Sequence, residues 1–302
     1  MIRFGLVGTN TSHAGVFAGI FNGSQTTPPA LEGGRVVAVW GDTSDEARDL
    51  GESRHLPDAP ALATAHQIDA VVADPHEMIG QIDAVLVVDD TGLGANHGRL
   101  ARPFVEAGIP TFVDKPMTLE LDEAVALFNL AARHGAPLMS ASALRFAHEI
   151  ADLKARAAAI GPLSSVVSVG PGDWYNYGVH AVEMYQTLVG LGARWVYRSA
   201  APERDIAIVG YDTGPGVVVE TLRDAKYIFH LTAYGAEGRI DCEVADFQAF
   251  YTRMMAAVLE MARTGHSPVS RDQTLEVLGV LHAGLRSVEL GRPVRLDEVL
   301  HT

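Results

Sequence analysis

The sequence predicts an α/β protein with two domains: a doubly wound parallel sheet, then an α+β domain with a mostly antiparallel sheet. Up to about Ser142, short apolar runs alternate with helical patterns, and most runs are continuous, as in strands covered on both faces. After Arg145, strand-like runs follow one another with turn residues between them. At 302 residues the chain has ample material for two cores. We expect the domains to span residues 1–143 and 144–302.

The strands of the first domain should be the short apolar runs. They are Ile2–Val7, Arg35–Trp40, Ala70–Ala73, Ala84–Val88, Pro110–Val113 and Pro137–Ser140. Helical patterns lie between them at His13–Phe21, Ser44–Glu52, Asn96–Glu106 and Leu121–His134. Because parallel strands share one direction, their carboxyl ends should meet at one edge of the sheet, where ligands bind.

The second domain should begin with a helix at Ala147–Ala159 and a strand at Leu163–Val169. A loop rich in glycine and aromatic residues, Gly170–Tyr177, precedes a helical pattern at Val179–Leu191. Four further runs read as strands, and turns such as Arg223–Ala225 suggest antiparallel hairpins between them. The runs are Trp195–Ser199, Ile206–Val209, Val217–Thr221 and Tyr227–Leu231, and helices at Asp246–Arg263 and Gln273–Leu290 follow.

Composition limits the partners and the compartment. The formal net charge of -14 argues against a nucleic acid or an anionic membrane as partner. The single Cys242 rules out an intramolecular disulfide and fits a reducing compartment. The sequence starts directly with a strand, and no run approaches the length of a membrane span. We therefore expect a cytoplasmic protein.

The segment Gly5–Ala14 follows the first strand and opens a helix, which is the place of a dinucleotide-binding loop in a Rossmann domain. Of the three glycines of such a loop only Gly8 is present, and Asn10 and His13 take the places of the others. Asn10 tolerates the left-handed region and is expected to rescue the turn. An ordinary strand–helix turn is the alternative. The residues expected to bind the cofactor are Gly8, Thr9, Asn10, Thr11, Ser12 and His13.

An acid follows the second strand in Gly41-Asp42. A carboxylate at this place binds the ribose 2′-hydroxyl of NAD and repels the 2′-phosphate of NADP. Asp42 lies one residue beyond the usual place, and the following Thr43 and Ser44 are alternative helix caps. The sequence favours NAD over NADP.

The fifth strand ends in Asp114-Lys115-Pro116. Pro116 lacks an N–H group and disfavours the α region for Lys115, so the strand must stop here. Lys115 is thereby placed at the carboxyl end of a parallel strand, with Asp114 expected on the cofactor side. A solvated surface lysine is the alternative interpretation.

Several motifs in order resemble the Gfo/Idh/MocA family of NAD(P)-dependent sugar and polyol oxidoreductases. Asp114-Lys-Pro116 resembles the family's E/D-K-P, and His97 lies ahead of it at the spacing of the family's histidine. Leu144-Arg-Phe146 resembles the segment that leaves the nucleotide domain, and Ile160–Leu163 the turn into the second domain. Asn176–Glu183, with His180 inside it, resembles D-x-G-x-H-x-x-D.

The resemblance implies that Lys115 hydrogen-bonds the reacting hydroxyl or carbonyl and that His180 exchanges its proton. Asn176 stands in place of the family's aspartate and is expected to orient His180, since helical spacing would put both on one face. A helix N-cap is the alternative for Asn176, and a buried structural histidine for His180. The residues expected to contact the substrate are His97, Arg145, Trp174, Tyr175 and Tyr177, although the aromatic ones could equally belong to the core.

Three functions remain open at this point. The first is hydride transfer between NAD(P) and a sugar, polyol or related hydroxy compound. The second is transient oxidation by tightly bound NAD for epimerisation, elimination or glycoside cleavage, and the third is a non-catalytic ligand sensor of the same fold. His180 and Glu183 are three residues apart, but no compact set of ligands accompanies them, so no metal is expected. Family likeness implies a homodimer or homotetramer.

Overall fold

The computed structural model describes residues 1–43 and 56–300. The chain divides into two compact units, Met1–Ala141 with Tyr251–Ser270, and Ser142–Phe250 with Arg271–Thr302. Residues 251–270, which the sequence pattern assigns to the second domain, thus pack with the first unit. The predicted helix Ser44–Glu52 lies outside the described residues.

The first unit is built on a parallel sheet of strand order β3-β2-β1-β4-β5-β6, which confirms the predicted fold class. Its central strands are buried on both faces, as their continuous apolar sequences predict. The strands are β1 (Ile2–Val7), β2 (Gly34–Trp40), β3 (Ala70–Val71), β4 (Ala84–Val87), β5 (Thr111–Val113) and β6 (Leu138–Ser140).

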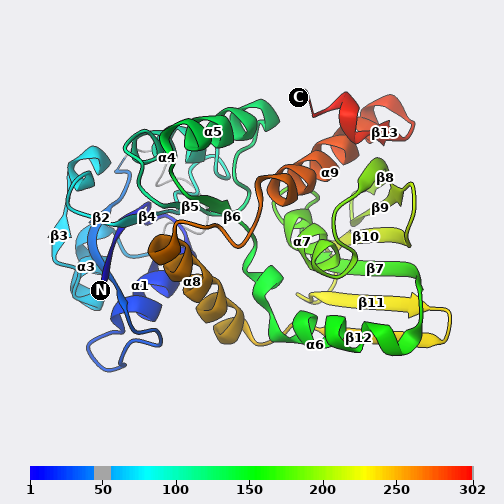
Figure 1. Ribbon diagram of the computed structural model, residues 1–302, viewed down its shortest axis with the longest axis horizontal. Coiled ribbons are helices and arrows are strands. Elements are labelled where there is room, and N and C mark those ends of the chain that lie inside the picture. The colour runs from blue at the N-terminus through cyan, green and yellow to red at the C-terminus, as the bar shows by residue number, and fades with distance from the viewer. Residues whose placement is uncertain (44–55, 301–302) are drawn as a thin grey trace. The chain divides into compact units, whose positions relative to one another are not determined.

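Helices cover both faces of this sheet (Figure 1). Helices α1 (Ser12–Asn22), α3 (Ala59–His66) and α8 (Phe247–Thr264) lie on one face, and α4 (His97–Glu106) and α5 (Leu121–His134) on the other. Helix α3 was not predicted, because it is short and rich in alanine; it is defined by its cap, where Asp58 Oδ1 accepts the N–H of Ala61 at 2.9 Å.

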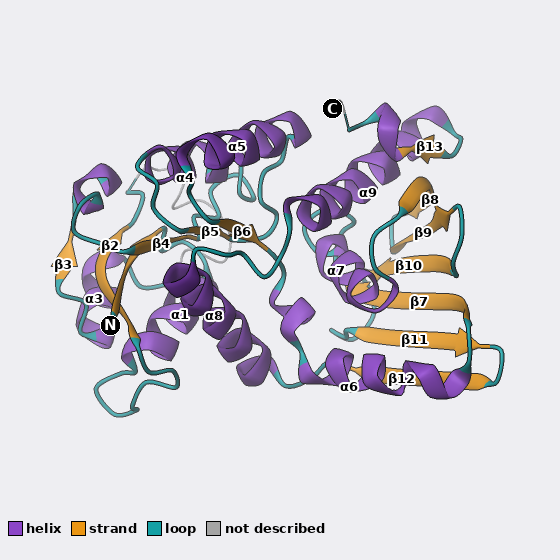
Figure 2. Ribbon diagram, in the orientation of Figure 1, coloured by secondary structure: helices purple, strands orange, loops and turns teal. Residues whose placement is uncertain are grey.

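The second unit contains a sheet of order β12-β11-β7-β10-β9-β8-β13, shown in Figure 2. All neighbours are antiparallel except β7 and β10, so the mostly antiparallel sheet is confirmed. The predicted hairpin at Arg223–Ala225 is wrong, because β7 lies between β10 and β11. The strands are β7 (Leu163–Pro171), β8 (Ala193–Ala201), β9 (Arg204–Tyr211), β10 (Gly216–Leu222), β11 (His230–Gly235), β12 (Gly238–Glu243) and β13 (Val294–Arg295).

Helices α7 (Gly178–Val189) and α9 (Arg271–Leu290) pack on one face of this second sheet. Ser168 on β7 donates its hydroxyl to the carbonyl of Ala181 at 2.7 Å, which ties α7 to the sheet. Helix α6 (His148–Arg156) packs along β12. Short 3-10 turns complete the described elements at η2 (Pro75–Met78), η3 (Ala143–Phe146), η4 (Ala157–Ile160) and η5 (Leu296–Glu298). Among residues 1–43 and 56–300, no helix has the length and apolarity needed to cross a membrane.

Candidate active site

The carboxyl ends of β1 and β4 are in direct contact at Gly8. Its φ is +107°, and an added Cβ would lie 2.4 Å from the backbone nitrogen of Asp89. No other residue type fits this backbone without displacing the β4 end. The single glycine that the loop retains is therefore the one that the close approach of β1 and β4 requires.

Asn10 holds this loop by its side chain rather than by a special backbone conformation. It does not adopt the positive φ expected of it, since Gln67 and Leu93 are the non-glycine residues with positive φ in the described chain. Instead its Nδ2 donates to Thr91 Oγ1 at 2.8 Å, and its Oδ1 accepts the N–H of Asp90 at 2.8 Å. Asn10 thus fastens the first loop to the loop after β4.

The first turn of α1 combines a capped backbone with a paired histidine. Thr11 is the N-cap and accepts the N–H of His13, while Ser12 is exposed. The Nδ1 of His13 pairs with Asp114 Oδ2 and its Nε2 lies 2.8 Å from the hydroxyl of Tyr251 on α8. Both ring nitrogens are engaged within the first unit, so the imidazole links three elements, α1, the end of β5 and α8.

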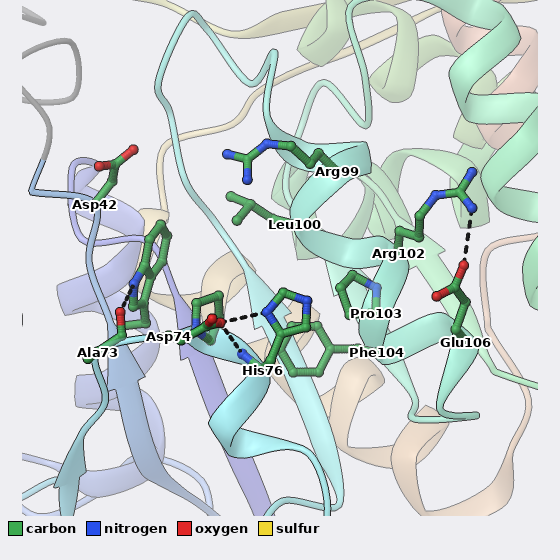
Figure 3. Close-up of a pocket in the computed structure, with 12 residues that line it drawn as sticks. Asp42, Ala73, Asp74, His76, Arg99, Leu100, Arg102, Pro103, Phe104 and Glu106 are labelled. Carbon is green, nitrogen blue, oxygen red and sulfur yellow. Dashed lines mark hydrogen bonds and ion pairs between the residues drawn. The ribbon is translucent and has the colours of Figure 1, made fainter.

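Asp42 borders a cavity of about 640 Å³ between the end of β2, the segment before η2 and helix α4 (Figure 3). Thr9 is 8% exposed and fills the space beside Gly41. A Cβ added to Gly41 would lie 2.4 Å from Thr9 Oγ1. Figure 3 shows Arg99 on the α4 side of the cavity, its guanidinium directed toward the side of Asp42. The cavity has the size of a ligand pocket. Its lining residues are Trp40, Asp42, Ala73, Asp74, Pro75, His76, Arg99, Leu100, Arg102, Pro103, Phe104 and Glu106.

These features fit a dinucleotide. Helix α1 begins soon after the carboxyl end of β1, and the N-terminus of a helix in this place binds anions in many α/β folds. The acid after β2 stands beside a cavity large enough for a nucleoside. The side chains of Asn10 and His13, in contrast, are occupied by protein partners. Any contact of these two residues with a cofactor is therefore left to their backbone.

Lys115 follows β5; Asp114, the residue before it, is buried, and the peptide bond to Pro116 is cis. Burial raises the pKa of the Asp114 carboxyl, but the charge and hydrogen bond of His13 and the charge of Lys115 outweigh it and lower this pKa to about 2. Burial raises the pKa of Asp90, although the charge of Lys115 acts in the opposite direction. Lys115 thus stands among carboxylates of its own unit.

His97 contacts the backbone that follows Lys115. It is 1% exposed, and its Nδ1 lies 2.9 Å from the carbonyl oxygen of Pro116. Because a carbonyl can only accept, Nδ1 carries the proton. The substrate role predicted for His97 stays a prediction; the contact that the structure gives it is with the backbone after Lys115.

In the second unit, His180 lies in the first turn of α7 and is 8% exposed. Its Nδ1 lies 2.6 Å from the hydroxyl of Ser142. Tyr177 is the N-cap of α7, so Asn176 is not the cap. Asn176 precedes the helix in a turn where its N–H donates to Asp173 Oδ1 at 2.8 Å, and the role predicted for its side chain stays a prediction.

A buried ion pair lies one turn further along α7. Arg145 Nε donates to Glu183 Oε2 and its Nη2 donates to Gln186 Oε1, and the side chains of Arg145 and Glu183 are 7% and 2% exposed. Burial raises the pKa of Glu183, whereas the Arg145 charge lowers it. The Arg145 guanidinium, predicted to contact substrate, is engaged here by protein groups. Within the described residues, no group of three or more His, Cys, Asp or Glu side chains is arranged to hold a metal ion.

The three aromatic residues of the loop before α7 differ in their surroundings. Trp174 is 2% exposed and its indole N–H donates to the carbonyl of Leu281 at 2.9 Å, which makes it part of the core of this unit. The Tyr175 hydroxyl lies 3.0 Å from His282 Nε2. The ring of Tyr177 is 5.8 Å from that of His180, so Tyr177 is the one in ring contact with this histidine.

Sequence reasoning missed Ser142, Tyr251 and Arg99. Ser142 and Tyr251 reach their histidines across 38 and 238 residues, a distance over which a single sequence carries no pairing signal. Arg99 follows His97 on an exposed helix face, where a lone arginine is ordinarily solvated.

Comparisons with known proteins agree with this geometry. Residues 2–142 match the model of the Gfo/Idh/MocA group, an oxidoreductase family with an NAD-binding Rossmann fold. The D-xylose 1-dehydrogenase (NADP(+)) 2 of Haloferax volcanii is 26% identical over 98% of this chain and all of that protein. The crystal structure of a putative myo-inositol dehydrogenase from Sinorhizobium meliloti superimposes with a TM-score of 0.80 at 19% identity, covering 98% of this chain and 100% of that one.

An oxidoreductase from Agrobacterium radiobacter, crystallised with NAD+, L-tartaric acid and magnesium, gives a TM-score of 0.80 at 13% identity over 99% of both chains. At such identities the structural likeness shows the fold, while the match over residues 2–142 carries the family. Residues 2–142 therefore belong to the Gfo/Idh/MocA group of oxidoreductases with an NAD-binding Rossmann fold.

Proposed function

We propose that the protein transfers hydride between a nicotinamide cofactor and a CH–OH group of a sugar, polyol or related hydroxy compound, with Lys115 and His180 as its catalytic residues. The observation that carries the proposal is the place of Lys115. It follows β5 at the sheet edge where the α1 N-terminus and the cavity beside Asp42 also lie, all within one unit. Open α/β sheets bind their ligands at this edge.

The chain's own groups would act on the reacting oxygen. Lys115 would donate a hydrogen bond to the hydroxyl or carbonyl oxygen and stabilise the negative charge that develops on it. His180 would take the hydroxyl proton during oxidation and return it during reduction. The nicotinamide, when bound, supplies the hydride acceptor or donor. Asp114, held as a carboxylate by His13, places a negative charge directly before Lys115.

The cofactor would bind along the first unit. Its pyrophosphate would lie at the N-terminus of α1, next to the backbone of Thr11 and Ser12, and its adenosine in the cavity with the ribose beside Asp42. The Asp42 carboxylate supports NAD, because it would repel a 2′-phosphate. A sugar-like substrate is supported by the relatives, whose names include a D-xylose and a myo-inositol dehydrogenase.

We further propose a homodimer or homotetramer that assembles through the second sheet. The face of this sheet opposite α7 and α9 exposes large apolar side chains on neighbouring strands. Tyr197 on β8 is 40% exposed and pairs across the strands with Ile208 on β9, which is 44% exposed. Such a patch is typical of a protein interface. A cytoplasmic location remains a proposal, supported by the single cysteine.

The decisive test is turnover by the Lys115→Ala variant. Purified protein is titrated with NADH by fluorescence and assayed by nicotinamide absorbance on pentoses, hexoses and inositols. We expect Lys115→Ala to lower kcat by ~10²-fold to 10³-fold with NADH affinity unchanged. Lys154→Ala, on the exposed surface of α6, is the matched control and should be fully active.

Three results would contradict the proposal in different ways. Full activity of Lys115→Ala removes the role of the lysine. Substrate conversion without a net change in nicotinamide absorbance indicates transient oxidation by bound NAD. Failure to bind either nicotinamide at millimolar concentration indicates a sensor that retains only the fold.

A further inference from the structure

We propose that Ser142 is the positioning residue for His180, holding the Nδ1 side of the imidazole so that proton exchange with the substrate takes place at Nε2. The inference rests on the proposed function, in which His180 moves the proton. Ser142 is fully buried, and its Oγ lies 2.6 Å from His180 Nδ1. Both residues belong to the second unit.

The hydroxyl is itself fixed in place. Ser142 is the N-cap of η3, and its Oγ accepts the N–H of Leu144 at 3.2 Å. A hydroxyl oxygen has two lone pairs, so it can accept this N–H and the Nδ1–H of His180 together. When the exchanged proton sits on Nε2, Nδ1–H donates to Ser142, and it still does so after Nε2 has lost that proton. The same hydrogen bond therefore serves both protonation states of the ring.

The backbone of Ser142 is anchored to the same helix. Its N–H donates to Glu183 Oε1 at 3.3 Å, and the other carboxylate oxygen of Glu183 accepts from Arg145. His180 and Glu183 are three residues apart, so they share one face of α7. Ser142 thus meets two successive turns of α7, one through its side chain and one through its main chain. Arg145, which binds Glu183, also donates to Gln186 Oε1, so its guanidinium is held by two residues of α7.

Ser142 gives His180 a hydrogen-bond partner from outside the motif. Asn176 stands where a carboxylate partner of the histidine is expected, in the turn before α7, and its N–H donates to Asp173 Oδ1. Ser142 contacts Nδ1 from the start of the second unit. As a neutral group it fixes the orientation and tautomer of the ring without adding a negative charge beside it.

The kinetic test compares two buried serines that both hydrogen-bond to α7. Ser142→Ala should lower kcat by ~10-fold to 100-fold while KM changes less than ~3-fold, because the ring loses its orientation but the binding contacts remain. Ser142→Thr keeps the hydroxyl and should recover most of kcat. The control is Ser168→Ala, which removes the bond to the Ala181 carbonyl beside His180 and should leave kcat within ~2-fold. Circular dichroism confirms that each variant is folded.

The structural readout is the ¹⁵N NMR signal of the His180 ring in the full chain, assigned with His180→Gln. Ser142→Ala should shift the Nδ1 resonance and Ser168→Ala should not. The proposal is overturned if Ser142→Ala keeps kcat within ~2-fold, if the Nδ1 resonance does not move, or if Ser168→Ala loses as much activity. A wild-type protein that turns over no sugar contradicts the proposed function; the ¹⁵N signal then decides separately whether Ser142 holds the ring.

Discussion

Replacement of His13 by alanine should destabilise the first unit strongly, because it leaves a buried carboxylate without its partner. The Asp114 side chain is 7% exposed and that of His13 is 13% exposed. Removing one partner of a buried ion pair costs ~3–5 kcal/mol, since the remaining charge keeps its desolvation penalty. The hydrogen bond between His13 Nε2 and the Tyr251 hydroxyl is lost as well.

The pKa of Asp114 gives a second estimate of the magnitude. This pKa is about 2, against 3.8 for a free aspartate. At ~1.36 kcal/mol per pKa unit, the difference corresponds to about 2 kcal/mol of stability at neutral pH. We therefore expect His13→Ala to lower the free energy of unfolding by about 3 kcal/mol at pH 7. Tyr251→Phe, which removes one hydrogen bond and leaves the ion pair, should cost about 1 kcal/mol.

The sign of the pH dependence follows from the lowered pKa. The stability that ionised Asp114 contributes is fully present above pH ~4, the unfolded-state pKa, and is lost as the pH falls through the folded value of about 2. In His13→Ala, burial without a partner favours the protonated acid. The difference between the wild type and the variant should therefore be largest above pH ~5 and shrink toward pH ~2.

Urea unfolding followed by circular dichroism between pH 7 and pH 2.5 measures both effects. His76→Ala is the matched control, because His76 pairs with Asp74 at 2.6 Å but both side chains are 60% exposed. Its unfolding midpoint should not change, since exposed pairs contribute little. Equal midpoints for His13→Ala and wild type at pH 7 would refute the reasoning, and so would a difference that is independent of pH.

Two further predictions follow from the cavity and from the second sheet. Asp42→Ala should lower kcat/KM for NAD by ~10-fold and raise it for NADP. The variant removes the carboxylate beside the proposed ribose site and leaves Arg99, whose positive charge would attract a 2′-phosphate. An unchanged preference between NAD and NADP would place the ribose elsewhere. Ile208→Lys should reduce the mass measured by light scattering toward the 32.2 kDa of one chain, with Leu290→Lys, exposed at the end of α9, as the control. An unchanged mass would exclude this face as the interface.

Much of the fold could be predicted because its signals are local. Continuous apolar runs gave the strands of the parallel sheet, and β1 and α5 have the predicted bounds. The elements that were missed are α3, β12 and β13, which are short or polar. The placement of residues 251–270 with the first unit depends on tertiary contacts of α8, such as Tyr251 with His13, and these leave no periodic trace in the sequence.

The site was less predictable than the fold, because its motifs specify positions along the chain and not partners in space. The place of Asn10 suggested a special backbone, whereas the structure uses its side chain to hold the β4 loop. The sequence pattern did not locate the start of α7, which begins two residues after Asn176. For Asn10 the contacts come from a distant segment, and the same holds for the contact of Ser142 with His180.

Two buried charge pairs bear on whether the chain is an enzyme or a scaffold. Burying Asp114 with His13 and Glu183 with Arg145 is energetically expensive, and well-packed apolar groups at such positions are often neutral or stabilising. A scaffold has no use for them. Each pair instead adjoins a proposed catalytic group: Asp114 precedes Lys115, and Glu183 anchors the serine that contacts His180. The altered motifs therefore argue for a rebuilt site, in which the buried charges that remain adjoin the two side chains proposed to be catalytic.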